Sequence, residues 1–212
     1  MKLYTYFRSS SSFRVRIALN LKELEYESVF VHLVKDEQTS AEHLARNPQG
    51  LIPVLDTGDA MLTQSPAIID YLDETYPEPA LLPTDPIAKA QVRAMVNLIA
   101  CEMQPLNNLA VLKHLKSDLG QDQDGVNAWY KHWVDRGFTA LEKHLEKHSG
   151  SYCFGDTITM ADVFLIPQVW NARRFDCDLS KFPKIEAVEK RLYQLDAFVR
   201  ALPENQADNP DK

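Results

Sequence analysis

Cysteine and glycine are scarce in this sequence, and their scarcity excludes several kinds of site. The 212 residues include only three cysteines, with long spacings and no CxxC pair: Cys101, Cys153 and Cys177. A disulfide framework and a structural zinc site are therefore not expected, and a reducing, cytoplasmic setting fits best. The seven glycines form no loop of the kind that cradles nucleotide phosphates, so a nucleotide ligand is not expected either.

An excess of basic residues and long apolar runs are also missing. The formal net charge is -7, which argues against general nucleic-acid binding. No run of about 18 apolar residues occurs, and the first residues lack the apolar core of a signal peptide, so we expect no membrane partner. Apolar residues make up 45% and charged residues 25%, as in a globular protein. Only the polar tail, residues 204–212, is expected to be frayed.

The first 76 residues alternate between strand and helix patterns. Strands are predicted over residues 2–6 and 28–34, helices over 13–22 and 41–46, and a hairpin from 52–56 and 60–63 around Thr57-Gly58-Asp59. A helix is predicted over 65–76, capped by Ser65 with Pro66 at its first position. The order βαβαββα predicts a mixed sheet, since it combines a parallel crossover with a terminal hairpin.

A proline-rich linker follows, and strand patterns then stop. Four prolines fall within residues 77–86. Helices are predicted over 87–115, 124–148, 160–174 and 184–202, and Thr159 with Asp162 forms a capping box at the start of the third. The sequence therefore predicts an α/β domain over residues 1–80 and an all-helical domain over residues 87–212.

Four consecutive serines, Ser9 to Ser12, precede the first predicted helix, with Arg8 and Arg14 on either side. The simplest interpretation is a turn and a helix cap. A second is anion binding by the free N–H groups at the helix start. A third is that a serine hydroxyl stabilises a thiolate brought by a ligand, because a hydrogen bond and the helix dipole both lower a thiol pKa.

Two further segments favour the third interpretation. NPQGLIPVL, residues 47–55, places a proline before an apolar strand, and a cis Ile52-Pro53 bond would expose the Ile52 backbone to an extended peptide. QSPAIIDYL, residues 64–72, offers the Gln64 amide, the Ser65 hydroxyl and free helix-start N–H groups to an amino-acid head group. A thiolate site, a backbone strip and such a receptor correspond to the three parts of glutathione.

Four segments together resemble the zeta class of glutathione transferases, and within it the bacterial maleylpyruvate and maleylacetoacetate isomerases. They are YFRSSSSFRVRIAL, NPQGLIPVL, QSPAIIDYLDE and ITMADVFLIPQVWNARRF. The resemblance covers nearly the whole chain. It implies a thioredoxin-like, glutathione-binding first domain, an all-helical, substrate-binding second domain and a homodimer.

The resemblance also implies roles for individual residues. Ser9, with Ser10 beside it, activates the glutathione sulfur, and Ser11 stands where the family usually has a cysteine. The other implied glutathione contacts are Gln38, Ile52, Gln64, Ser65, Gln104 and Asn108.

Arginines are the candidates for holding a dianionic substrate. Arg8 precedes the serines, and Arg174 lies on a helix that the family uses to line the substrate site. Either side chain could bind a carboxylate through two hydrogen bonds. Arg173 is the immediate rival of Arg174, because neighbours on a helix face different directions. Arg14 and Arg16 could simply pair with acidic groups.

The activity that the resemblance implies is glutathione-dependent cis–trans isomerisation by reversible thiolate addition to a cis double bond. Maleylpyruvate, converted to fumarylpyruvate, is the favoured substrate, and maleylacetoacetate is the alternative. A general transferase that conjugates electrophiles would instead favour an apolar acceptor pocket. A non-catalytic binding module is the third possibility, which the intact Ser9, Ser10, Gln64 and Ser65 argue against.

Overall fold

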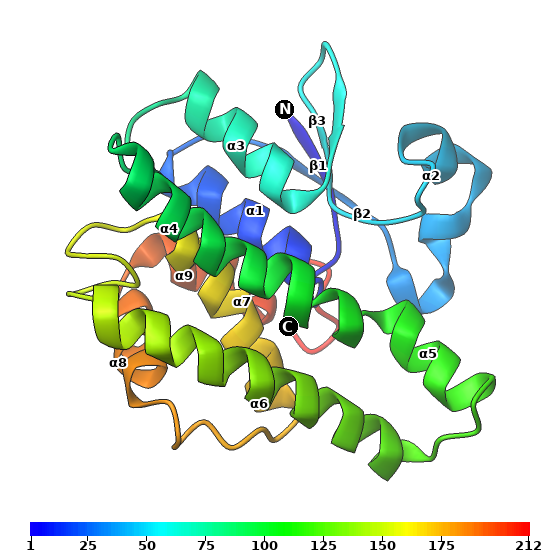
Figure 1. The fold of residues 1–212 in the computed structure, drawn as a ribbon. Coiled ribbons are helices and arrows are strands. Elements are labelled where there is room, and N and C mark those ends of the chain that lie inside the picture. Colours follow the sequence, from blue (N-terminus) through cyan, green and yellow to red (C-terminus); the bar gives the residue numbers. More distant parts are fainter. The chain divides into compact units, whose positions relative to one another are not determined.

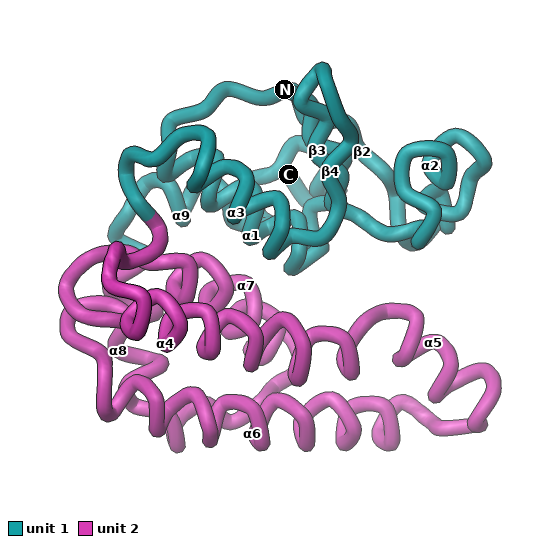
Figure 2. The backbone as a smooth tube through the Cα atoms, turned by 45° about the horizontal axis from the view of Figure 1, so that its top comes forward, with its two compact units in different colours: residues 1–80, 193–212 teal, residues 81–192 magenta.

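The computed structural model describes all residues, 1–212, and divides the chain into two compact units (Figures 1 and 2). Residues 1–80 and 193–212 form the first unit, and residues 81–192 form the second. The sequence-based boundaries fell at residues 80 and 87. The structure differs from them at the C-terminus, because the last 20 or so residues belong with the first unit rather than with the helical one.

The first unit contains a four-stranded mixed sheet in the order β2-β1-β3-β4. β1 pairs in parallel with β2 and antiparallel with β3, which pairs antiparallel with β4. The α1 and α3 helices lie on one side of the strands and α2 on the other in both views. In chain order the elements are β1 (Lys2–Thr5), α1 (Ser10–Leu21), β2 (Glu27–Phe30), the short turns η1 (Leu33–Lys35) and η2 (Glu37–Thr39), α2 (Ala41–Arg46), β3 (Val54–Asp56), β4 (Met61–Thr63), α3 (Ser65–Thr75), α9 (Asp196–Ala201) and η5 (Pro203–Asn205).

The sequence patterns explain this architecture. The mixed sheet and the βαβαββα order are confirmed. Leu3 of β1 pairs with Leu55 of β3, and both side chains are fully buried. The apolar stripe of α3, Ile68, Ile69 and Leu72, is also fully buried, as an amphipathic helix covering a sheet requires.

The second unit is entirely helical. It contains α4 (Pro86–Asn97), the π-helical turn η3 (Leu98–Met103), η4 (Pro105–Asn107), α5 (Leu109–Ser117), α6 (Gln123–His148), α7 (Met160–Arg174) and α8 (Pro183–Leu192). The mixed α/β first unit and this helical unit confirm the predicted fold class. None of the helices combines the length and the hydropathy that crossing a bilayer requires.

Helix α7 is the buried helix of the second unit, and its start is fixed by the capping box predicted from the sequence. The Asp162 carboxylate accepts hydrogen bonds from the Thr159 backbone N–H (2.8 Å) and hydroxyl (3.0 Å). It also accepts one from the Cys153 N–H (2.8 Å), which ties the preceding loop to the helix.

Helix α6 packs closely against η3 at Gly137. An added Cβ at this position would come within 2.1 Å of the Met103 thioether sulfur, so the contact requires a glycine.

Three local expectations are corrected by the structure. The helix predicted over 87–115 is α-helical only to Asn97 and continues as the π-helical turn η3, after which Pro105 begins a separate turn because it cannot continue a helix. The helix predicted over 184–202 is divided into α8 and α9. The tail is held in place rather than frayed, since the Gln206 amide donates to the carbonyls of Arg200 and Leu202, both at 2.8 Å.

Candidate functional site

Ser9 occupies the N-cap of α1, immediately before the helix. Its Oγ accepts a hydrogen bond from the Ser12 backbone N–H at 3.2 Å. Because the oxygen accepts this bond, the hydroxyl hydrogen remains available to donate to an anion. The positive end of the α1 dipole lies at the same place, so the position suits a negatively charged sulfur.

The neighbouring serines and Arg8 surround this cap. Ser10 is buried and Ser11 is partly exposed, and both lie in the first turn of α1, where backbone N–H groups have no helical acceptor. Arg8 is exposed, and its guanidinium carbon lies 5.2 Å from the centre of the Phe7 ring. Its cation–π contacts with Phe7 and Tyr6 hold a positive charge one residue before Ser9.

The start of α3 provides a second set of donors. Gln64, rather than Ser65, is the N-cap, and its side chain makes no capping bond. Gln64 has φ 66° and ψ 113°, a left-handed φ that is uncommon outside glycine and that clusters at ligand sites. The Gln64 amide donates to the Gln49 side chain at 2.7 Å, which joins the QSPAIIDYL segment to the NPQGLIPVL segment. Ser65, at the first helical position, is buried.

Arg14 connects the two helix starts. Its side chain is 2% exposed, and Nη1 donates to the Ser65 hydroxyl at 3.2 Å. The guanidinium thus orients Ser65 and adds a buried positive charge beside the α3 N-terminus. The sequence suggested that Arg14 could simply pair with an acidic group, so its contact with a candidate ligand-binding serine was missed. The only signal was a pair of arginines, Arg14 and Arg16, among the apolar residues of α1.

The loop before β3 is held at the Leu51 carbonyl. This oxygen accepts from the Asn47 amide (2.8 Å) and lies 3.0 Å from His43 Nε2. Since a carbonyl can only accept, His43 Nε2 carries the hydrogen. The next peptide bond, Ile52-Pro53, is cis, as the sequence predicted. The sequence assigned no role to His43, which is in fact buried and fixes this loop.

Gln38 lies against the same loop. Its backbone oxygen is 3.3 Å from the position of a Cβ built on Gly50, which has φ 63°. The Gln38 amide nitrogen donates to Asp36 at 3.2 Å, whereas its Oε1 is buried and accepts no hydrogen bond. A buried amide oxygen without a donor costs free energy, so an N–H from a bound ligand would satisfy it.

Gln104 and Asn108 lie in the second unit, around the turn η4. Gln104 follows the π-helical turn and is partly exposed. Asn108 is the N-cap of α5, and its Oδ1 accepts from the Ala110 N–H at 3.0 Å. This cap gives Asn108 a structural role, but it leaves the amide hydrogens of the side chain able to donate elsewhere.

The structure separates the two adjacent arginines of α7. Arg173 donates to Glu189 of α8 from Nε (2.8 Å) and from Nη2 (2.5 Å). Arg174 instead lies over the rings of Trp170 and Phe175, with its guanidinium carbon 4.8 Å from the centre of the Phe175 ring. Arg173 therefore stabilises the contact between α7 and α8, and Arg174 is presented on an aromatic platform.

Tyr130 forms the base of that platform. Its ring stacks on Phe175 with 3.7 Å between centroids and 7° between planes. Burial raises the pKa of the Tyr130 hydroxyl well above its usual range, while the nearby charge of Arg174 opposes the shift. The Tyr130 carbonyl accepts a hydrogen bond from Asn107 of η4, so the platform and the Gln104–Asn108 turn belong to one packed region of the second unit.

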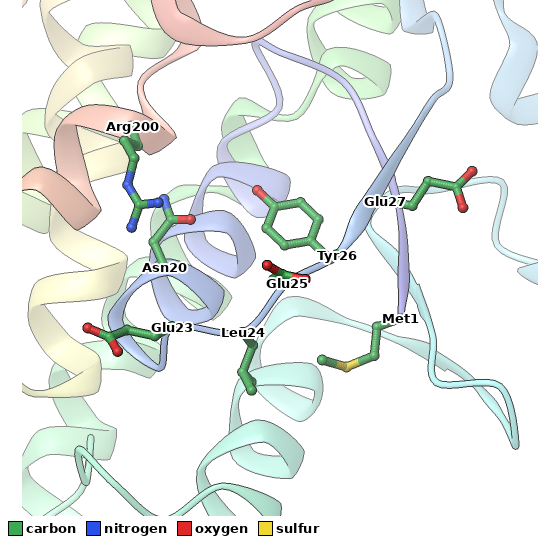
Figure 3. Close-up of a pocket in the computed structure, with 8 residues that line it drawn as sticks. All are labelled: Met1, Asn20, Glu23, Leu24, Glu25, Tyr26, Glu27 and Arg200. Atoms are coloured by element: carbon green, nitrogen blue, oxygen red, sulfur yellow. The ribbon is translucent and has the colours of Figure 1, made fainter.

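A pocket of the first unit lies at the other end of α1 from Ser9 (Figure 3). It contains none of the predicted site residues, and three glutamates line it, so it would repel an anionic ligand. Its lining residues are Met1, Asn20, Glu23, Leu24, Glu25, Tyr26, Glu27 and Arg200.

Comparison with known proteins identifies the family. The model described as "Glutathione S-transferase, N-terminal domain" matches residues 1–74, and that described as "Glutathione S-transferase, C-terminal domain" matches residues 123–201. The chain belongs to the glutathione S-transferase family.

Three relatives refine this assignment. A probable maleylacetoacetate isomerase of Vibrio cholerae is 49% identical over 208 residues, covering 97% of each chain. A holo structure of maleyl pyruvate isomerase, described as a bacterial glutathione S-transferase of the zeta class, is 48% identical, covers 98% of this chain and 99% of its own, and has a TM-score of 0.96. A maleylacetoacetate isomerase structure from Methylobacterium extorquens, with bound malonate and glutathione, is 37% identical, covers 99% of this chain and 100% of its own, and also has a TM-score of 0.96. The predicted resemblance to the zeta class is confirmed.

Proposed function

We propose that this protein is a glutathione-dependent cis–trans isomerase of a maleyl-type keto-dicarboxylate. Maleylpyruvate, converted to fumarylpyruvate, is the substrate we favour, and maleylacetoacetate is the second candidate. The observation that carries the proposal is the Ser9 hydroxyl, which caps α1 through its oxygen and keeps its hydrogen for an anionic sulfur. The relatives, named for both isomerisations and in one case solved with glutathione and a dicarboxylate, support it.

The first unit offers groups that fit glutathione. We assign the γ-glutamyl end to Ser65 and Gln64 at the start of α3, where Arg14 supplies positive charge. The peptide backbone of the ligand would pair with Ile52, and Gln38 Oε1 would accept an N–H. Ser9, Ser10 and Ser11 would surround the sulfur, and Gln104 and Asn108 of the second unit would provide further polar contacts.

When bound, glutathione would supply a thiolate that adds reversibly to the conjugated cis double bond; the single bond that results can rotate, and departure of the thiolate restores the double bond in the trans form. The protein must keep the thiol ionised at neutral pH. A free thiol has a pKa near 8.5, and lowering it by about two units requires roughly 2.7 kcal/mol. A hydrogen bond from the Ser9 hydroxyl to a charged sulfur would contribute about 1.5 to 3 kcal/mol, and the α1 dipole about 0.3 to 2 kcal/mol, so together they are of the size needed.

Arginines hold the two carboxylates of the substrate in this proposal. Arg174 is held over Trp170 and Phe175, and aromatic support of this kind orients a guanidinium for two hydrogen bonds to one carboxylate. Arg8 supplies positive charge next to Ser9. Because the chain carries a net charge of -7, local positive charge is needed to attract a dianion.

We further propose that the protein works as a homodimer in the cytoplasm, as the family resemblance implies. Its cysteines are all free, and Cys153 is buried, which suits a reducing compartment.

The direct test is an absorbance assay with purified maleylpyruvate and maleylacetoacetate, each with and without glutathione. We expect trans product only with glutathione, and no net loss of free thiol as product accumulates. Equal rates without glutathione would contradict the proposal. Stoichiometric loss of thiol would indicate conjugation instead of isomerisation.

A further inference from the structure

The C-terminal segment ends beside the loop that carries Ser9. Helix α9 packs along α1, and the Asn20 amide of α1 donates to the Ala197 carbonyl at 2.9 Å. After α9, the Asn205 and Gln206 amides donate back to carbonyls at the end of that helix and to the Leu202 carbonyl just after it, so the chain turns instead of extending into solvent. The chain therefore ends within the first unit, as Figure 2 shows.

Asp208 contacts the Ser9 loop directly. Its Oδ2 accepts a hydrogen bond from the Phe7 backbone N–H at 2.9 Å, a contact between residues 201 positions apart. Its Oδ1 is buried and accepts no hydrogen bond. The one hydrogen bond that the Asp208 carboxylate accepts therefore comes from the backbone N–H of Phe7, two residues before Ser9.

Arg16 holds the other side of the same peptide. Its guanidinium is fully buried and donates to the Phe7 carbonyl at 3.1 Å and to the Tyr6 carbonyl at 3.4 Å. It also donates to the Ala201 carbonyl at the end of α9, from Nε (3.1 Å) and Nη2 (3.0 Å). The backbone before Ser9 is thus fixed between an arginine of α1 and the C-terminal segment.

The charge of Asp208 also matters to Arg16. Burial lowers the pKa of Arg16 to about 10, and the charges of Tyr26 and Asp208 oppose this shift. Burial raises the pKa of the Tyr26 hydroxyl, so Tyr26 is neutral at pH 7. A carboxylate at Asp208 therefore favours the charged form of the buried guanidinium.

The turn from Tyr6 to Ser9 connects the backbone held by Asp208 and Arg16 to Ser9, the N-cap of α1. The Ser9 N–H donates to the Tyr6 carbonyl at 3.0 Å, and this carbonyl is one that Arg16 also holds. We propose that Asp208 is a positioning residue for Ser9: through Phe7 and Arg16, the C-terminal segment fixes the hydroxyl that faces the glutathione sulfur. The inference rests on the proposed function of Ser9.

The test compares Asp208→Asn and Asp208→Ala with Asp211→Asn, an exposed residue of the same tail that loses the same charge. A chain ending at Gln206 is compared in the same way with one ending at Pro210, which retains Asp208. The measured quantity is the thiol pKa of bound glutathione, followed by ultraviolet absorbance of the thiolate, together with kcat. We expect Asp208→Ala to raise that pKa by roughly one unit and to lower kcat about tenfold. The Asp211→Asn protein and the chain ending at Pro210 should match wild type.

A double-mutant comparison separates positioning from general stability. In a Ser9→Ala background, Asp208→Ala should have no further effect on the thiol pKa, because both changes act through one hydroxyl. If Ser9→Ala raises the pKa but Asp208→Asn, Asp208→Ala and the Gln206 truncation leave it at the wild-type value, the positioning role is refuted and the proposed function stands. If Ser9→Ala itself leaves the thiol pKa unchanged, both the positioning role of Asp208 and the proposed role of Ser9 are refuted.

Discussion

Arg173 of α7 forms a two-point ion pair with Glu189 of α8, while its neighbour Arg174 lies on the Trp170 and Phe175 rings. The pairing raises the pKa of the Arg173 guanidinium, chiefly through the hydrogen bonds to Glu189. An arginine committed to a buried carboxylate of its own chain is a poor receptor for a substrate carboxylate. The relationship therefore favours Arg174 over Arg173 as the substrate-binding residue.

Replacing the two arginines separately tests this assignment. We expect Arg174→Ala to raise KM for the dicarboxylate by roughly 10- to 100-fold, the effect of losing a charge-assisted hydrogen-bonded pair, with a smaller change in KM for glutathione. Steady-state kinetics with varied substrate and saturating glutathione measure the effect.

Arg173→Ala is the matched control. It should leave KM for the dicarboxylate near wild type and lower the free energy of unfolding by about 1 to 3 kcal/mol, because Glu189 remains buried without its partner. The opposite pattern, with the KM effect at Arg173 and none at Arg174, would assign substrate binding to Arg173.

Arg14 is expected to determine glutathione affinity. Its contact with the Ser65 hydroxyl places a buried charge at the start of α3, so Arg14→Met should raise KM for glutathione about tenfold or more while KM for the dicarboxylate changes little. Arg14→Lys, which keeps the charge, should show a smaller effect. If calorimetric titration finds equal glutathione affinity in wild type, Arg14→Lys and Arg14→Met, the assignment of the γ-glutamyl end to this position is incorrect.

The protein's own cysteines should be dispensable for turnover. Cys101 is exposed, Cys153 is buried, and burial raises the pKa of Cys177 to about 11. At pH 8 only about one Cys177 in a thousand is then a thiolate, so iodoacetamide should modify Cys101 first. The rate at Cys177 should rise about tenfold per pH unit up to about pH 11, which peptide mass spectrometry can follow.

Alkylated enzyme should retain its glutathione-dependent activity, because Ser11 stands where the family usually has a cysteine and no cysteine lies among the four serines. The Cys101→Ser protein, treated in the same way, is the control, because the group that iodoacetamide adds to Cys101 could block glutathione near Gln104. Loss of activity in the treated Cys101→Ser protein would mean that Cys153 or Cys177 takes part in turnover.

Local signals predicted the elements whose boundaries are set locally. Ser40 caps α2 by accepting from the His43 N–H at 3.2 Å, and the helix ends before Pro48, so its observed range, Ala41–Arg46, matches the prediction. The capping box of α7 worked in the same way. The hairpin and the mixed sheet followed from alternation and from the Thr57-Gly58-Asp59 turn.

Features that depend on distant partners were not predictable from the sequence. The polar tail was expected to fray because it has few apolar residues. It is held instead by the Gln206 amide, which donates to carbonyls at and just after the end of α9, and by Asp208, which accepts from the Phe7 N–H 201 residues away. The choice between Arg173 and Arg174 likewise depended on Glu189, 16 residues along the chain. Arg14 and Arg16 looked alike in sequence, yet one orients a serine hydroxyl and the other holds backbone carbonyls.

The central claim is that the Ser9 hydroxyl, at the start of α1, keeps the glutathione sulfur ionised. The most direct measurement is a pH titration of glutathione bound to wild type and to Ser9→Ala, followed by thiolate absorbance. Asp85→Ala, which removes the cap of α4 in the second unit, controls for the loss of a helix cap. We predict a pKa about two units below that of free glutathione in wild type and in Asp85→Ala, and an intermediate value in Ser9→Ala, where the α1 dipole remains but the hydroxyl is lost. The same pKa for wild type and Ser9→Ala would contradict the account.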